Sequence, residues 1–122
     1  LGQQDATLEY ARDRLGQHCI IGISCYNDFS LAQQAAVKGA DYIAFGAFFP
    51  SGTKPLALAA SPELLYGAKQ ELEIPVVAIG GITPHNAADL LDAGADMLAV
   101  IQGLFAQPDI RSVARAFSSL FD

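Results

Sequence analysis

Hydroxyl, carboxylate and ammonium side chains alternate with glycines at a few places in this 122-residue sequence. An apolar run ends in Gly80 and Gly81, and a second apolar run ends in Gln102 and Gly103. Backbone without side chains lets a ligand approach bare N–H groups, and hydroxyls with one cation supply the other donors that a phosphate needs. The residues of these types expected in the loops that follow strands are Ser24, Asn27, Ser51, Thr53, Lys54, Gly81 and Gln102. They predict a site for phosphate or diphosphate.

Each candidate also has a simpler structural explanation. Glycine pairs serve tight turns, Ser24 could bond backbone groups at its own turn, and Lys54 could be an ordinary solvated lysine. Lys54 is the only Lys or Arg in these loops, however, and the neighbouring Ser51 and Thr53 favour a role for it. Asp5 is either the N-cap of the next helix or a hard carboxylate ligand for Mg²⁺.

Other reactive side chains offer less. His18 and His85 are expected at a turn and on a helix surface, and the sequence contains no His/Cys spacing typical of a metal site. Cys19 and Cys25 are predicted to be buried free thiols. Tyr26 could line an aromatic ligand site, together with Phe45, Phe48 and Phe49.

Composition excludes some partners. The 13 acidic residues outnumber the 7 basic ones and give a formal net charge of −6, which argues against a nucleic-acid surface. No apolar run approaches the length of about 20 residues that spans a bilayer, and no signal peptide is visible, so we expect a cytoplasmic protein. The sequence has no initiating Met and begins within a motif, so we expect it to be part of a longer protein.

Helix and strand patterns alternate along the chain. Four nearly continuous apolar runs predict buried parallel strands at residues 19–25, 41–45, 75–79 and 97–101. Amphipathic patterns predict helices at 7–15, 28–38, 61–72, 84–93 and 110–120, with Thr83 and Pro84 opening the fourth. The triplets Gly39-Ala40-Asp41 and Gly94-Ala95-Asp96 form a weak repeat at two helix-to-strand junctions.

Four strand–helix units predict an α/β fold, but a (β/α)8 barrel requires eight. The chain is therefore either an open α/β domain or half of a barrel. A half barrel would leave two sheet edges and an apolar layer uncovered, so it would need the other half or a second copy of itself.

Four motifs in order resemble those of thiamine-phosphate synthases. They are Gly2-Gln3-Gln4-Asp5, Gly22-Ile23-Ser24, the segment 46–54 and the segment 78–83. The resemblance covers nearly the whole chain and the C-terminal half, or slightly more, of a family member. It implies that residues 1–122 are the C-terminal part of one TIM barrel. It also implies that the whole enzyme joins hydroxymethylpyrimidine diphosphate to thiazole phosphate with Mg²⁺ present, releasing diphosphate.

The resemblance also implies a role for each matching residue. Asp5 would be one of two Mg²⁺ ligands, and Ser24 and Lys54 would contact the diphosphate of the pyrimidine substrate. The thiazole phosphate would be bound by the residues Ser51, Gly52, Thr53, Gly81, Ile101 and Gln102. The diphosphate would leave first, and the thiazole nitrogen would then capture the pyrimidine-methyl cation.

Three positions depart from the family pattern. Ser51 replaces Thr and keeps the hydroxyl, whereas Gln102 replaces Ser and leaves only a backbone N–H for the phosphate. Tyr26 stands where many relatives carry His, which argues against the related thiazole tautomerase. The pyrimidine-diphosphate cluster and the other Mg²⁺ ligand of the family have no counterpart in the sequence. An inactive phosphate-binding fragment, a structural half barrel and a tautomerase-like isomerase therefore stay open as alternatives.

Overall fold

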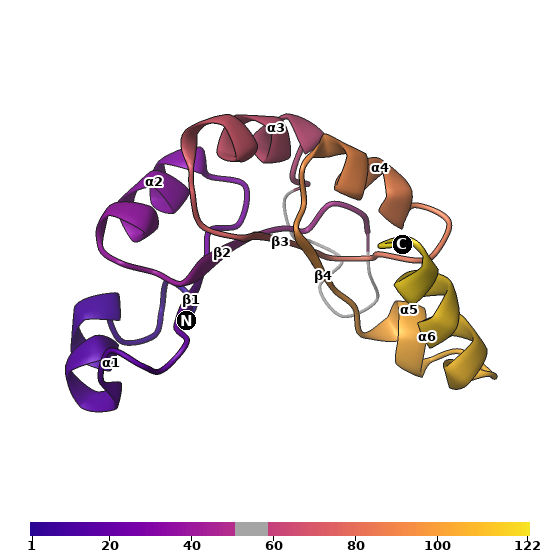
Figure 1. The fold of residues 1–122 in the computed structure, drawn as a ribbon, viewed down its shortest axis with the longest axis horizontal. Helices are drawn as coiled ribbons and strands as arrows, with labels where there is room; N and C mark the ends of the chain where they lie inside the picture. Colours follow the sequence, from indigo (N-terminus) through magenta and orange to yellow (C-terminus); the bar gives the residue numbers. More distant parts are fainter. Residues whose placement is uncertain (51–58) are drawn as a thin grey trace.

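A computed structural model describes residues 1–50 and 59–122 of the chain. Its four strands form one parallel sheet in the sequential order β1-β2-β3-β4, as the apolar runs predict. The strands are β1 (Gly22–Ser24), β2 (Tyr42–Phe45), β3 (Val76–Ile79) and β4 (Met97–Ala99). The sheet curves into an arch, and the described helices follow its convex side (Figure 1).

The helices precede, connect or follow the strands in the expected alternation. Their bounds are α1 Leu8–Leu15, α2 Phe29–Val37, α3 Pro62–Glu71, α4 Ala87–Ala93, α5 Gln102–Phe105 and α6 Ile110–Ser119. Polar side chains cap four of them, because Thr7, Asp28, Ser61 and Asp109 each accept a backbone N–H of the first turn. Within the described ranges, no helix is both long and apolar enough to cross a membrane.

Several predicted boundaries were wrong. The first and last strands are shorter than their apolar runs, and Gln102 begins the short helix α5, which the sequence reading missed. Helix α4 begins at Ala87, with Asn86 as its N-cap, rather than at Pro84. Thr83 precedes an extra turn, where its hydroxyl accepts the His85 N–H at 3.3 Å. Cys19 is exposed rather than buried, because strand β1 begins only at Gly22.

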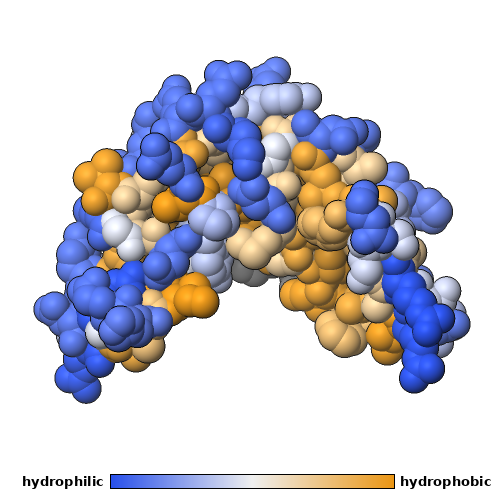
Figure 2. Space-filling model, in the orientation of Figure 1, coloured by the Kyte–Doolittle hydropathy of each residue, from blue (hydrophilic) through white to orange (hydrophobic). Residues whose placement is uncertain are grey.

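The two faces of the sheet differ in burial. On the convex face, Ile43, Phe45, Val76 and Ala78 are at most 1% exposed, and Phe45 stacks on Phe29 of α2. On the other face, Ile79 is 37% exposed and Met97 is 40% exposed. Figure 2 shows apolar surface along the inner side of the arch. The described helices therefore bury one face of the sheet. On the other face, part of an apolar layer is left exposed.

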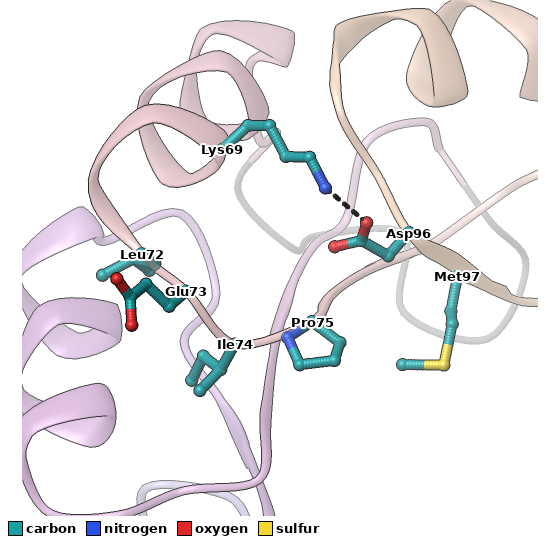
Figure 3. Close-up of a pocket in the computed structure, with 7 residues that line it drawn as sticks. All are labelled: Lys69, Leu72, Glu73, Ile74, Pro75, Asp96 and Met97. Carbon is teal, nitrogen blue, oxygen red and sulfur yellow. Dashed lines mark hydrogen bonds and ion pairs between the residues drawn. The ribbon is translucent and has the colours of Figure 1, made fainter.

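The repeated Gly-Ala-Asp triplets form the same structure twice at the amino ends of the strands. Asp41 accepts the Ile21 N–H at 2.7 Å and pairs with Arg12 at 2.9 Å. Asp96 accepts the Val76 N–H at 2.9 Å and pairs with Lys69 at 2.6 Å (Figure 3). Each aspartate thus ties the start of the preceding strand to a cation from a helix. This explains the repeat as a structural device at the end of the sheet opposite the predicted site.

We predict that Asp96→Asn lowers the free energy of unfolding at pH 7 by about 1 kcal/mol, because a partly exposed ion pair is lost. Partial burial raises the pKa of Asp96, but hydrogen bonds from Lys69 and the Val76 N–H outweigh this and hold it below 3.8. A lowered carboxyl pKa contributes stability above the ordinary value and loses it as pH falls through the folded value. Urea unfolding should therefore show the variant and the wild type converging below about pH 3.8.

The matched control is Asp13→Asn, which changes an exposed carboxylate of α1 with no ion pair among the described residues. It should leave stability nearly unchanged across the same pH range. Equal losses for Asp96→Asn and Asp13→Asn at pH 7 would contradict the structural role of the Gly-Ala-Asp repeat.

Candidate functional site

The turn formed by Gly2–Asp5 lies at the carboxyl end of β1. The Leu1 carbonyl oxygen accepts the Ser24 N–H at 2.8 Å, and the Gln3 side chain donates to the Ser24 carbonyl oxygen at 2.8 Å. The Gly2 N–H donates to Asp5 Oδ2 at 2.7 Å, so one carboxylate oxygen closes the turn. The N-cap of α1 is Thr7, and Asp5 is therefore not the cap of this helix. The structure brings the predicted residues Asp5 and Ser24 to the same place.

Ser24 is the last residue of β1, and its side chain is partly exposed. Among the described residues, its hydroxyl has no hydrogen-bond partner, so the simpler explanation of a turn-stabilising hydroxyl is not supported there. The next residue, Cys25, is buried, and burial raises the pKa of its thiol to about 11. That thiol is therefore protonated at neutral pH and serves as a core side chain rather than a nucleophile.

Backbone hydrogen bonds join the ends of the first three strands. The Gly46 N–H after β2 donates to the Tyr26 carbonyl oxygen at 3.0 Å. Phe48 and Phe49 donate to the carbonyl oxygens of Ile79 and Gly80 at 3.2 and 3.1 Å. We call the carboxyl rim the Gly2–Asp5 turn together with residues 24–28, 46–50, 80–83 and 101–104. These hydrogen bonds connect the loops that follow β1, β2 and β3 into one continuous surface at the carboxyl end of the sheet.

Gly81 and Gly103 bring the third and fourth strand ends together. A Cβ on Gly103 would lie 2.1 Å from the Ile82 carbonyl oxygen, so the turn after β4 lies directly on the residue after Gly81. Gly81 has φ +64°, and its Cβ would lie 2.6 Å from the Pro50 carbonyl oxygen. The space where a Gly81 side chain would lie is thus filled by the loop after β2. Its N–H remains the group that can bind an anion.

The N–H groups of Gly81, Gln102 and Gly103 make no hydrogen bond to another described residue. Ile101 is the N-cap of α5, and the side chains of Ile101 and Gln102 are exposed. The predicted residues Ser51, Gly52, Thr53 and Lys54 lie outside the described residues. The described part of the rim therefore contains Asp5, Ser24, Gly81, Ile101 and Gln102. They lie along it in the strand order that the sequence predicts.

The rim fits Mg²⁺ in part. Asp5 is exposed and uses only Oδ2 in its turn, which leaves Oδ1 for a cation. Magnesium in proteins is often bound by one or two carboxylates together with waters and substrate phosphates. Within the described ranges, no group of three or more acidic, His or Cys side chains forms a metal cage. Asp5 can therefore contribute one ligand to a cation that a phosphorylated substrate also binds.

A hollow at the opposite end of the sheet does not share these features. It is lined by the residues Lys69, Leu72, Glu73, Ile74, Pro75, Asp96 and Met97 (Figure 3). Lys69 and Asp96 point toward each other there and neutralise each other at 2.6 Å. Its one cation is therefore engaged in holding the strands, and the carboxyl rim is the better candidate site.

We predict that Gly103→Ala weakens phosphate binding at the rim and lowers the free energy of unfolding by about 1–3 kcal/mol, the usual cost of overpacking. The added methyl would overlap the Ile82 carbonyl oxygen, a backbone atom that cannot rotate away. Calorimetric titration with inorganic phosphate, together with thermal melting, measures both effects. The control is Gly67→Ala in α3, where the added methyl would meet a ring carbon of Phe29 at 3.3 Å rather than a backbone atom. It should leave phosphate binding unchanged. Normal phosphate binding by Gly103→Ala would show that this turn is not part of the site.

Nearly the whole chain is similar to known proteins. A family described as thiamine monophosphate synthase matches residues 1–104. The chain is 53% identical over 121 residues to a thiamine-phosphate synthase of Nitrosococcus oceani and 51% identical over 121 residues to one of Thiobacillus denitrificans. These matches cover 99% of this chain and 56% and 57% of the two relatives. The chain thus spans about half the length of the curated relatives that it matches.

A solved structure agrees with the sequence matches. The thiamine phosphate pyrophosphorylase from Pyrococcus furiosus superimposes with a TM-score of 0.87 at 35% sequence identity. The superposition covers 98% of this chain and 56% of that one. The arrangement of parallel strands and helices is therefore shared with a larger protein over nearly all of this chain.

Proposed function

Because the chain belongs to the thiamine monophosphate synthase family, we propose that it supplies part of the active site of a thiamine-phosphate synthase. The whole protein would join hydroxymethylpyrimidine diphosphate to thiazole phosphate and release diphosphate. The observation that carries the proposal is the carboxyl rim, where one parallel sheet brings Asp5, Ser24, Gly81 and Gln102 to the same edge. In parallel α/β folds, ligands bind at this end of the strands.

Two parts of the rim would divide the work. At the end of β1, Asp5 would bind the diphosphate of the pyrimidine substrate through Mg²⁺, and Ser24 would bind it through its hydroxyl. The N–H groups of Gly81 and of the 101–103 turn would bind the thiazole phosphate, with Ser51, Gly52 and Thr53 proposed from the sequence alone. Lys54, likewise proposed from the sequence, would stabilise the charge of the leaving diphosphate.

The chemistry requires charge stabilisation more than proton transfer. When bound, Mg²⁺ would neutralise charge that develops on the leaving diphosphate. Asp5 would hold that cation with Oδ1, while its Oδ2 stays bound to the Gly2 N–H. Fixed donors that point at developing charge lower the barrier without reorganising during the step. This explains why the rim offers hydroxyls and N–H groups and why its one thiol, Cys25, is a protonated core residue.

We also propose that the chain forms about half of a (β/α)8 barrel in the cytoplasm. Sequential parallel strands, helices on the convex side and the partly exposed Ile79 and Met97 on the other face support this architecture. The outer edge of β1 can accept a parallel neighbour, because the Leu1 backbone already bonds Gly22 and Ser24 there. The other half of the barrel, or a second copy of the chain, would cover the apolar layer.

The test is to incubate residues 1–122 with both substrates and Mg²⁺, alone and after mixing with the other half of a relative's barrel. We expect thiamine phosphate only from the mixture, and we expect the isolated chain to self-associate in light scattering. Phosphate binding without product in either sample would instead favour an inactive binding fragment. Isomerisation of a thiazole phosphate without condensation would favour a tautomerase. A cooperative, strictly monomeric melt of residues 1–122 would contradict the half barrel.

A further inference from the structure

Tyr26 occupies a backbone conformation that its side chain disfavours. Its φ is +53°, and it is the only residue other than glycine with a positive φ in the described part of the chain. A side chain at such a position crowds the backbone, so glycine or asparagine usually occupies it. The neighbouring Asn27 has the more suitable side chain, yet the left-handed position falls on the tyrosine. Uncommon backbone conformations of this kind are concentrated at functional sites.

Hydrogen bonds on both sides fix this conformation. The Tyr26 carbonyl oxygen accepts the Gly46 N–H at 3.0 Å, which ties the residue to the end of β2. The preceding Cys25 N–H donates to the Ala44 carbonyl oxygen at 2.8 Å, and the Asp28 N–H donates back to the Cys25 carbonyl oxygen at 2.9 Å. The backbone of Tyr26 is therefore fixed by the strand ends around it, and this sets where its side chain leaves the main chain.

That direction is toward Asp5. A Cβ added to Gly2 would lie 3.3 Å from Asp5 Oδ2 and 3.6 Å from the Tyr26 hydroxyl oxygen. The carboxylate and the phenol thus flank the same glycine, so a phosphate group held by a cation on Asp5 would lie near the phenol hydroxyl. The Tyr26 side chain is 45% exposed, so it is not buried as a core residue would be. Its hydroxyl has no hydrogen-bond partner among the described residues.

We propose that Tyr26 is a further substrate-binding residue, whose phenol hydroxyl donates a hydrogen bond to a diphosphate oxygen beside Asp5. The proposal rests on the proposed function of the rim and adds a residue to it. A phenol is neutral at pH 7 and can donate to an anion next to a carboxylate without adding charge. Because Gly2 has no side chain, no Cβ fills the gap between the two groups.

The test compares Tyr26→Phe with the wild type in the natural full-length protein. Phenylalanine keeps the ring and removes only the hydroxyl. We expect inorganic diphosphate with Mg²⁺ to bind about tenfold more weakly in calorimetry, the usual effect of losing one hydrogen bond to a charged group. The KM for the diphosphate substrate should rise by a similar factor with kcat little changed, because the contact exists before the reaction begins.

Two further variants separate this role from packing. Tyr10→Phe makes the same change at an exposed tyrosine of α1 and should leave binding and kinetics unchanged. Tyr26→Gly suits the positive φ, so it should melt at no lower temperature than the wild type while losing diphosphate affinity at least as strongly as Tyr26→Phe. A lower melting temperature of Tyr26→Gly with normal diphosphate binding would show a packing role and overturn the proposal.

The binding measurement also distinguishes this proposal from the function on which it rests. If the wild type binds diphosphate but makes no thiamine phosphate, the proposed reaction fails and the comparison of Tyr26→Phe still decides the role of the hydroxyl. Normal diphosphate affinity of Tyr26→Phe in an active enzyme would overturn only the role of Tyr26. A wild type that binds no diphosphate would overturn both.

Discussion

Asp5→Asn should reduce turnover of the full-length protein by about 10²–10³-fold, the range typical for one well-placed electrostatic contact. The amide keeps an oxygen that can accept the Gly2 N–H, now bound at 2.7 Å, so the turn should survive. It removes the negative charge that would hold Mg²⁺ on the other oxygen. Steady-state kinetics at several Mg²⁺ concentrations should show that more Mg²⁺ restores part of the lost rate. The KM for thiazole phosphate should change much less.

Asp13→Asn on α1 is the control for charge alone, since Asp13 is also exposed and lies away from the rim. It should leave both the rate and the Mg²⁺ dependence unchanged. If Asp5→Asn behaved like Asp13→Asn, Asp5 would be a surface carboxylate that only closes its own turn, and the proposed magnesium ligand would be wrong.

Lys54→Met should also reduce kcat and kcat/KM by about 10²–10³-fold, because the lost charge would act mainly on the leaving diphosphate in the transition state. This prediction rests on the sequence, since Lys54 lies outside the described residues. Lys54→Arg should recover only part of the rate, because a planar guanidinium does not replace a compact ammonium. Single-turnover kinetics with saturating substrates isolates the chemical step from product release.

The control is Lys38→Met, which removes an exposed lysine that pairs with Glu9 at 3.5 Å after the end of α2. It should leave kcat unchanged. A Lys54→Met variant that only raised the KM, with normal kcat, would indicate that the lysine binds the substrate equally well before and during the reaction. The assigned role in stabilising the transition state would then be wrong.

Local patterns predicted the centres of the elements better than their ends. Apolar runs identified the four strands of the described residues, because strand residues such as Ile43 and Val76 are buried under the helices. The end of a strand depends on which backbone groups form hydrogen bonds with the neighbouring strand. Cys19 was wrongly predicted to be buried for that reason. The short helix from Gln102 was missed because its sequence continues the apolar run of β4.

The sequence predicted which residues belong to the candidate site, but it did not predict how their side chains are arranged. Strand order explains why Ser24 and Gly81 share an edge, and the sequence could supply that. The Asp5 carboxylate, by contrast, was equally compatible with a helix cap, and only the Thr7 cap and the Gly2 hydrogen bond exclude it. The nearness of Tyr26 to Asp5 depends on one left-handed backbone angle, which no sequence pattern near it predicts.

The most direct test of the proposed site is a crystal structure of the full-length protein with diphosphate, Mg²⁺ and inorganic phosphate bound. We expect diphosphate density beside Asp5 and Ser24, and phosphate density against the N–H groups of Gly81 and Gly103. Both anions would then lie on the carboxyl rim, next to the ends of neighbouring strands. An accessible, well-ordered rim that stays empty while anions occupy the hollow at Lys69 and Pro75 would contradict the proposed site.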